Sequence, residues 1–228
     1  IPPAWLARAT AWFDHQAVAT ASTLADIPRS CDRAQTLLTL PISMGGAGVR
    51  QQAIVAPAAF WSSLMSTVVA GCLEVSMPLD QILEDILEQL NIDPVRKEVM
   101  MKTGVLPRPS PHVGLSLAFR NFYRRCPFDK LQRELSRAAE KGIFNHIKSE
   151  NSSEAELAVL KSAAGRGAGT WLVRTTQFSN QAFVNAIRAR FALMPTGIPN
   201  SCPLCHQEVD CMHFLHCPKL KGRLLLRH

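Results

Sequence analysis

Four cysteines and four histidines crowd the last 27 residues, and this cluster constrains the fold more than any other feature of the chain. Its centre is Cys202-Pro-Leu-Cys205, followed after seven residues by His213 and after three more by Cys217. A Cys-x-x-Cys turn brings two thiolates to one ion, and a spacing of four places His213 and Cys217 on one side of a helical turn. Three sulfurs and one imidazole nitrogen make a closed tetrahedral set, so the pattern predicts a structural Zn2+ site.

Other ligand sets remain open within this cluster. His216 could replace Cys217 or His213, and Cys211 or His206 could compete for the ion. A cysteine-rich tail that binds no metal is the remaining interpretation. Since four protein ligands leave no open position, the predicted zinc is structural rather than catalytic. The odd total of seven cysteines and their clustering with histidine favour a reducing, intracellular setting over a disulfide scaffold.

The remainder of the chain predicts a mainly α-helical fold. Residues 78–92 carry apolar side chains on one face and acidic ones on the other, as an amphipathic helix requires. Residues 51–73 contain no charge, and we expect a fully buried core helix there rather than a membrane span, because proline and hydroxyl side chains interrupt the stretch. The prolines of residues 104–112 indicate an extended connector.

Two helix starts are signalled in the second half of the chain. Ser153, with Glu156 three residues on, has the spacing of a capping box. Ser179 is the expected N-cap of a further helix, which should turn Phe183 inward and Arg188 and Arg190 outward. We also predict that the tryptophans anchor the core rather than stack on bases, which concerns Trp5, Trp12, Trp61 and Trp171.

Positive charge is concentrated after residue 118. The chain has 25 Lys and Arg against 18 Asp and Glu, a net charge of +7, and residues 119–148 and 161–190 hold most of the excess. Basic stretches beside a zinc site favour phosphate contacts, although a solvated basic surface is the ordinary alternative. RNA or DNA is therefore the expected partner, with no membrane and no small-molecule substrate. The candidate contacts are Arg120, Arg124, Arg125, Arg188, Arg190, Lys219, Lys221, Arg223 and Arg227.

Several segments occur in an order that resembles non-LTR retrotransposon polyproteins, between their reverse transcriptase core and a restriction-like endonuclease. They are Leu40-Pro-Ile-Ser-Met-Gly-Gly-Ala-Gly-Val-Arg50, the glycine-rich turn 165–172, the basic helix ending at 191, and the Cys-His cluster. The resemblance implies that residues 1–50 end the polymerase thumb and that 51–200 form a helical linker. It implies further that 201–228 form a CCHC zinc knuckle leading toward the endonuclease.

The catalytic elements of that family are missing from this chain. It has no Asp-Asp pair for a polymerase and no Pro-Asp element for the nuclease, so we expect a non-enzymatic fragment that starts at Ile1 within a longer polypeptide. The resemblance implies a nuclear role in placing template RNA or target DNA for target-primed reverse transcription. A zinc-stabilised helical module that binds another protein is the alternative, and a degenerate element copy is a third interpretation. Salt sensitivity of binding separates the first two.

Overall fold

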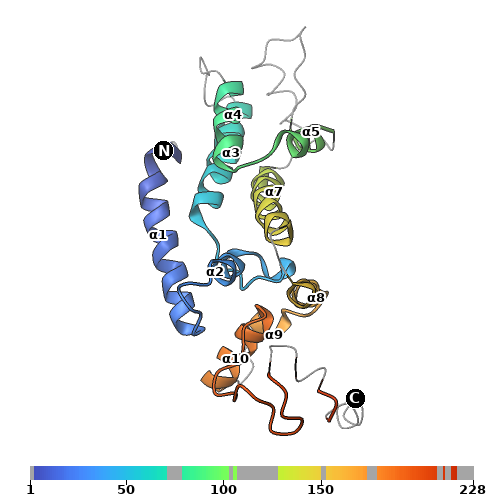
Figure 1. Cartoon of the computed structure of the whole chain (residues 1–228). Coiled ribbons are helices and arrows are strands. Elements are labelled where there is room, and N and C mark those ends of the chain that lie inside the picture. The colour runs from blue at the N-terminus through green and yellow to red at the C-terminus, as the bar shows by residue number, and fades with distance from the viewer. Residues whose placement is uncertain are drawn as a thin grey trace. The chain divides into compact units, whose positions relative to one another are not determined.

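The computed structural model describes residues 3–70, 79–102, 105–106, 128–149, 153–173, 179–209, 213 and 217–219. These residues are mainly helical, which confirms the predicted fold class, and they contain one isolated antiparallel bridge, between Ser201 and Glu208 (Figure 1). The elements are α1 (Pro3–Leu24), α2 (Asp32–Thr39), η1 (Ile42–Met44), α3 (Gln52–Val69), α4 (Leu79–Gln89), α5 (Pro94–Lys102), α7 (Phe128–Ser149), α8 (Glu154–Ala163), α9 (Thr170–Val173) and α10 (Asn180–Arg190).

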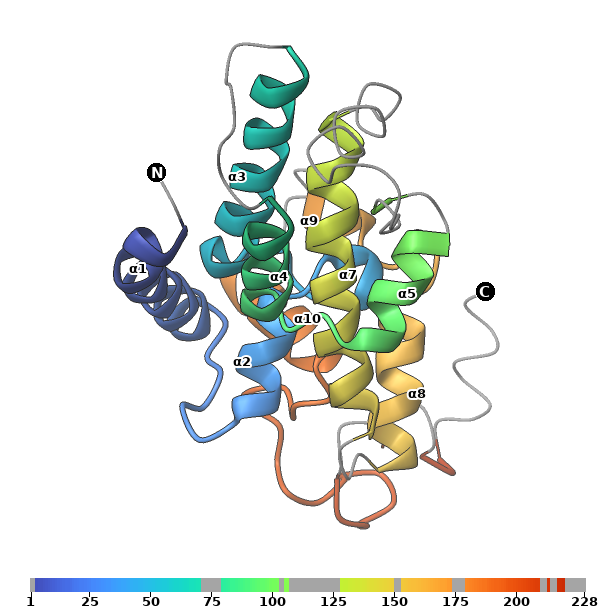
Figure 2. The same ribbon diagram turned by 90° about the horizontal axis from the view of Figure 1, so that it is seen from above.

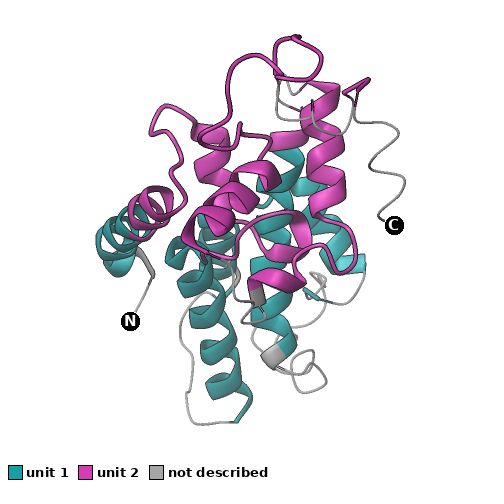
Figure 3. Cartoon of the chain, turned by 90° about the horizontal axis from the view of Figure 1, so that it is seen from below, with its two compact units in different colours: residues 1–16, 50–146 teal, residues 17–49, 147–228 magenta. Residues whose placement is uncertain are grey.

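The chain divides into two compact units, each assembled from two separate stretches of sequence (Figure 3). Unit 1 comprises Ile1–Gln16 and Arg50–His146, and unit 2 comprises Ala17–Val49 and Ile147–His228. The family resemblance implies a different division, at residues 50 and 200. That division concerns the segments of a polyprotein and not the packing of the chain, so it stays a prediction.

The core of unit 1 is built by α3, α4 and α7, with α3 and α4 side by side (Figure 2). Trp61 and Met65 of α3 are fully buried, and they pack in one cluster with Ile86 of α4 and Leu135 of α7. The predicted amphipathic helix is present as α4, and its leucines and isoleucines enter this cluster. Residues 107–112 of the predicted extended connector lie outside the described residues.

Helix α3 is buried along one face only, so the expectation of a fully buried helix is wrong. Its buried residues recur at helical spacing, from Pro57 and Ala58 through Trp61 to Met65 and Val68. By length and composition α3 would also pass as a membrane span, with a mean hydropathy of 1.3 and 33% of that window buried. Its packing against α4 is the arrangement of a core helix, in which one apolar stripe faces the protein.

The N-terminus of α3 is capped from α1. Gln51 makes no side-chain cap, and instead both carboxylate oxygens of Asp14 accept backbone N–H groups, from Gln52 at 2.6 Å and from Ala53 at 2.9 Å. A negative charge at this position satisfies two donors that the helix itself cannot pair and lies at the positive end of the helix dipole.

The aromatic side chains at the start of α1 are exposed. Trp5 is 79% exposed, Trp12 67% and Phe13 50%, whereas Trp61 is fully buried. The prediction of a core anchor is therefore confirmed for Trp61 and wrong for Trp5 and Trp12. Trp171 is half-buried, and its ring meets Phe183 edge to face at a centroid distance of 6.1 Å. Phe183 itself is 39% exposed, so its expected inward orientation is wrong.

The capping box of α8 is confirmed in unit 2. The Ser153 hydroxyl accepts from the backbone N–H of Glu156 at 3.2 Å, and the Glu156 carboxylate accepts from the backbone N–H of Ser153 at 2.8 Å. Glu156 also forms an ion pair with Arg33. The predicted cap of α10 is likewise present, since the Ser179 hydroxyl accepts from the N–H of Ala182.

We expect Ser153→Ala to lower the free energy of unfolding by about 1 kcal/mol, because the first turn of α8 then loses its capping acceptor. Urea unfolding followed by circular dichroism measures the change, with the exposed Ser162→Ala in α8 as the matched control. An unchanged midpoint for Ser153→Ala would show that water replaces the cap at no cost.

The two glycine-rich segments and α10 meet inside unit 2. A Cβ atom on Gly169 would lie 1.9 Å from Cγ2 of Ile42, so the turn before α9 approaches η1 as closely as glycine permits. The guanidinium of Arg190 joins both segments by donating to three backbone carbonyls, those of Gly46 at 3.1 Å, Ala168 at 3.2 Å and Ile42 at 2.8 Å. Sequence segments that were interpreted separately thus form one packed junction.

Candidate metal centre

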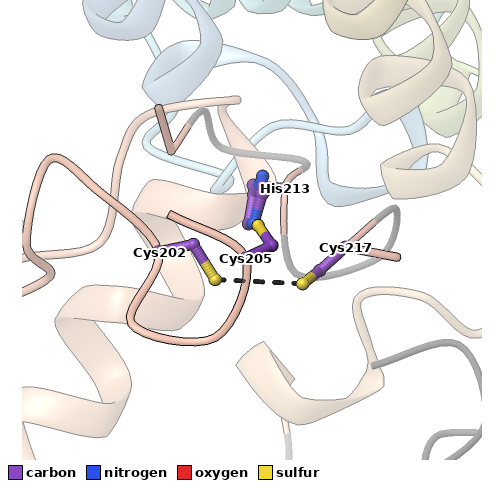
Figure 4. Close-up of side chains that lie close together, drawn as sticks. All are labelled: Cys202, Cys205, His213 and Cys217. Atoms are coloured by element: carbon purple, nitrogen blue, oxygen red, sulfur yellow. Dashed lines mark hydrogen bonds between the residues drawn. The ribbon is translucent and has the colours of Figure 1, made fainter. Parts of the chain in front are cut away.

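A tight backbone loop presents the first two thiols of the Cys-His cluster. The N–H of Cys202 donates to the carbonyl of Gln207, and the N–H of His206 donates back to the carbonyl of Cys202, both at 2.8 Å. The loop closes with His206 at φ 61° and with the bridge between Ser201 and Glu208. Pro203 and Leu204 therefore occupy the turn, with the sulfur of Cys202 directed toward Cys217 and that of Cys205 toward His213 (Figure 4).

His213 and Cys217 contribute the second pair of side chains. The N–H of Cys217 donates to the carbonyl of His213, which is the i to i−4 hydrogen bond that their spacing in the sequence predicts. All four side chains converge, and their ligand atoms lie within 4.8 Å of one another.

The distances fit a tetrahedral ion. The sulfurs of Cys202 and Cys217 are 3.8 Å apart, and the sulfur of Cys205 lies 3.3 Å from Nε2 of His213. With metal–sulfur bonds of about 2.3 Å and metal–nitrogen bonds of about 2.0 Å, a tetrahedron has sulfur–sulfur edges of roughly 3.8 Å and sulfur–nitrogen edges of roughly 3.5 Å. A disulfide would need about 2.05 Å between sulfurs, and all three cysteines are free thiols.

Burial and hydrogen bonding prepare the thiols unequally. The pKa of Cys202 falls to about 6, because backbone N–H groups of Cys205 and Leu204 donate to its sulfur, against the opposing effect of burial. Burial raises the pKa of Cys205, and the neighbouring sulfurs of Cys202 and Cys217 add to the rise. Cys202 is therefore the thiol most ready to ligate as thiolate, while an arriving cation must displace the proton of Cys205.

The cluster sits over a very small apolar core. Cys202 and Cys217 are 2% and 1% exposed, and they pack with Val209, Met194 and Ile198. Four ligands that close around one point leave no position for a substrate or water, so the arrangement can hold a metal ion and cross-link two chain segments. It has no open position for catalysis.

Of the three alternative ligands, the structure describes only His206. His206 is described and exposed, and it does not belong to the converging group. Cys211 and His216 lie outside the described residues. The fourth described cysteine, Cys31, precedes α2 and is half-exposed, away from the cluster in sequence and absent from the group of convergent ligands.

Both arginines of α10 face the protein, so their expected outward orientation is wrong. Arg190 is 7% exposed, with its donors used by the three carbonyls of the glycine junction, and burial lowers its pKa without removing its charge. The side chain of Arg188 is 13% exposed and donates to the carbonyl of Met194 at 2.6 Å and to Asp26. The spacing of these residues predicts their positions on α10, but it does not show which segments of the chain cover them.

Of the other predicted nucleic-acid contacts, only Lys219 is described, and it is exposed two residues after the candidate ligand Cys217. The rest lie outside the described residues, namely Arg120, Arg124, Arg125, Lys221, Arg223 and Arg227. For these positions the predictions stand as they were made.

A basic stripe on α7 was not among the predicted contacts. Lys130, Arg133, Arg137 and Lys141 are all exposed. At 100° per residue they fall within a sector of about 80°, so one face of the helix carries four cations. The signal for this stripe in the sequence is the spacing of three, four and four residues between its cations, within the basic stretch of residues 119–148.

Comparisons of the chain with models of protein families, with curated proteins and with solved structures find no match. The assignment of function therefore depends on the residues and their geometry.

Proposed function

We propose that this chain is a nucleic-acid-binding module, held at its C-terminal end by a structural zinc ion in a CCHC knuckle and contacting phosphates through the basic stripe of α7. The observation that carries the proposal is the stripe itself, formed by Lys130, Arg133, Arg137 and Lys141. It extends over 12 residues, about 16.5 Å of helix. Phosphate groups along a nucleic acid are the partner that matches a row of exposed cations.

Acidic side chains of α7 offset the charge of this face only in part. Glu134 forms an exposed ion pair with Arg133 at 4.0 Å, and exposed pairs of this kind contribute little free energy. Glu140 is half-buried, and burial raises its pKa while Arg50 and Arg137 lower it. Arg50 therefore lies close enough to α7 to add positive charge beside the stripe, and it is exposed as well.

Zinc is the metal that the donor set favours. Three soft thiolates with one imidazole in tetrahedral arrangement suit zinc better than calcium or magnesium, which prefer oxygen ligands. When bound, the ion would cross-link the loop of Cys202 and Cys205 to the turn of His213 and Cys217. Lys219 would then be held directly beside the knuckle, where a further phosphate contact is available.

The resemblance to non-LTR retrotransposon polyproteins extends this proposal. It places the module between a polymerase core and an endonuclease in the nucleus, positioning RNA template or target DNA for target-primed reverse transcription. Sequencing the genomic DNA on both sides of this segment tests the extension. An upstream frame with an aromatic-x-Asp-Asp element and a downstream Pro-Asp nuclease would support it, and an independent gene with neither neighbour would contradict it.

The binding proposal is tested by replacing Lys130, Arg137 and Lys141 with glutamine and titrating labelled RNA and DNA by fluorescence anisotropy at several salt concentrations. We expect the dissociation constant to rise about tenfold or more in low salt. The slope of log affinity against log salt should fall by roughly 2 to 3, since each lost phosphate contact contributes about 0.9. The matched control removes the same charge elsewhere, by substituting glutamine for the exposed Arg29, Lys102 and Lys161.

The control variant shows whether nucleic-acid affinity depends on the position of the cations on α7 or only on the net charge of the chain. Equal losses in both variants would mean that overall charge and not the α7 stripe attracts the nucleic acid. Absence of salt-dependent binding by the unmodified chain would contradict the proposal and favour the protein-binding alternative.

A further inference from the structure

The exposed side of α1 alternates aromatic rings with basic side chains. Trp5, Arg8, Trp12 and His15 follow one another at spacings of three, four and three residues, and all four are exposed. At 100° per residue they fall within a sector of about 80°, so they form a single ridge along α1. We refer to these four residues as the aromatic ridge.

The aromatic ridge carries no competing negative charge. Asp14 is the single acid of α1, and its two oxygens are occupied by the N–H groups of Gln52 and Ala53. Asp14 is 9% exposed, so its charge is directed at the start of α3 and away from solvent. Arg8 thus stands between two tryptophans without an acid on the exposed face of the same helix.

We infer that the aromatic ridge binds single-stranded nucleic acid by stacking. Exposed indole rings offer flat platforms to bases of any sequence, and a cation between two such platforms reaches the phosphate that links the stacked nucleotides. Trp5 and Trp12 are seven residues apart, about 10.5 Å along the helix. That distance is about three times the 3.4 Å rise of one strand in a duplex. The ridge therefore engages separated bases of an extended strand, with Arg8 at the phosphate between them.

Charge complementarity identifies this partner. A helix that lies in a membrane surface needs a continuous apolar face, whereas Arg8 and His15 interrupt the aromatic ridge at each turn. Bases within a duplex are stacked on each other and offer no free face to an indole ring. The inference rests on the proposed function, to which it adds a surface on α1 that selects single strands, distinct in chemistry from the phosphate-binding stripe of α7.

The test measures binding of the full chain to a fluorescein-labelled oligothymidylate of about 12 nucleotides and to a duplex of the same length. We expect the double variant Trp5→Ala/Trp12→Ala to bind the single strand at least about tenfold more weakly and to bind the duplex within about twofold of the unmodified chain. Trp5→Phe/Trp12→Phe should keep most of the single-strand affinity. The control Leu24→Ala/Val95→Ala removes side chains that are 68% and 72% exposed, and it should change neither affinity.

The outcomes separate this inference from the proposed function. If the unmodified chain binds both probes and the double alanine variant binds the single strand equally well, the aromatic ridge is not a stacking site and the module still binds nucleic acid. If the unmodified chain binds neither probe in low salt, the inference and the proposed function are both wrong. Two other results for the double alanine variant would overturn the inference if its single-strand affinity is unchanged. Loss of binding to phosphatidylserine vesicles would assign the aromatic ridge to a membrane surface, and loss of a dimer in sedimentation would assign it to a second copy of the chain.

Discussion

Cys202→Ser is expected to lower zinc affinity at least about a thousandfold and to unfold the knuckle while the helices remain intact. A structural zinc ion contributes about 10–16 kcal/mol of apparent binding free energy at neutral pH, and a serine hydroxyl is a far poorer ligand than a thiolate. Competition with a chelator of known affinity measures the loss of metal. Amide hydrogen exchange of His206 and Val209 reports the local unfolding, since both N–H groups are paired within the loop.

Cys31→Ser is the matched control for this substitution, because Cys31 is a half-exposed free thiol outside the converging group. It should leave zinc content at one equivalent. Retention of one equivalent at unchanged affinity by Cys202→Ser would show that the ligand assignment is wrong. The same measurement on Cys217→Ser and His216→Ala decides between the two candidates for the fourth ligand.

The expected dependence of the proposed knuckle on metal follows from the small size of its apolar cluster. Its apolar cluster contains Cys202, Val209 and Cys217, with Met194, Ile198 and Cys205 packed against it. A segment of this size buries too little apolar surface to offset the conformational entropy of folding. Helices α3, α4 and α7, in contrast, share a core of their own, so we expect chelation to leave their circular dichroism almost unchanged.

The candidate metal site was predictable from the sequence because its geometry is local. The turn between Cys202 and Cys205 and the helical spacing of His213 and Cys217 each bring two side chains together within a few residues. The capping box of Ser153 and Glu156 was predictable for the same reason, since one turn of helix contains the whole interaction. Patterns of this length do not depend on where the rest of the chain lies.

The wrong predictions concern features that depend on distant segments. An apolar period showed that α1 and α3 are helices, but not that Trp5 and Trp12 would be left exposed or that α3 would be buried on one face. The orientation of Arg190 depends on residues about 145 positions earlier, which no window along α10 contains. Hydrophobic period predicts an element and its apolar face, and tertiary contacts decide what covers that face.

Arg190→Met should lower the free energy of unfolding by about 2–4 kcal/mol. Methionine fills a similar volume but donates nothing, so the carbonyl of Gly46 loses the donor that Arg190 supplies. The carbonyls of Ile42 and Ala168 keep the N–H of Gly45 and the indole N–H of Trp171. A buried acceptor left unpaired costs about 1–3 kcal/mol, and the two other lost hydrogen bonds add to this. Urea unfolding followed by circular dichroism measures the loss.

Arg190→Lys is the informative partner variant, because an ammonium group keeps the charge and can reach fewer of the three carbonyls than the planar guanidinium. It should lose stability to an intermediate extent, whereas the exposed Arg166→Met should lose almost none. Nucleic-acid affinity, measured below the unfolding transition, should be equal in Arg190→Met and the unmodified chain, since a side chain that is 7% exposed cannot touch a phosphate. A fall in affinity without a fall in stability would instead make Arg190 a contact residue, and it would show that the junction of the two glycine-rich segments opens when nucleic acid binds.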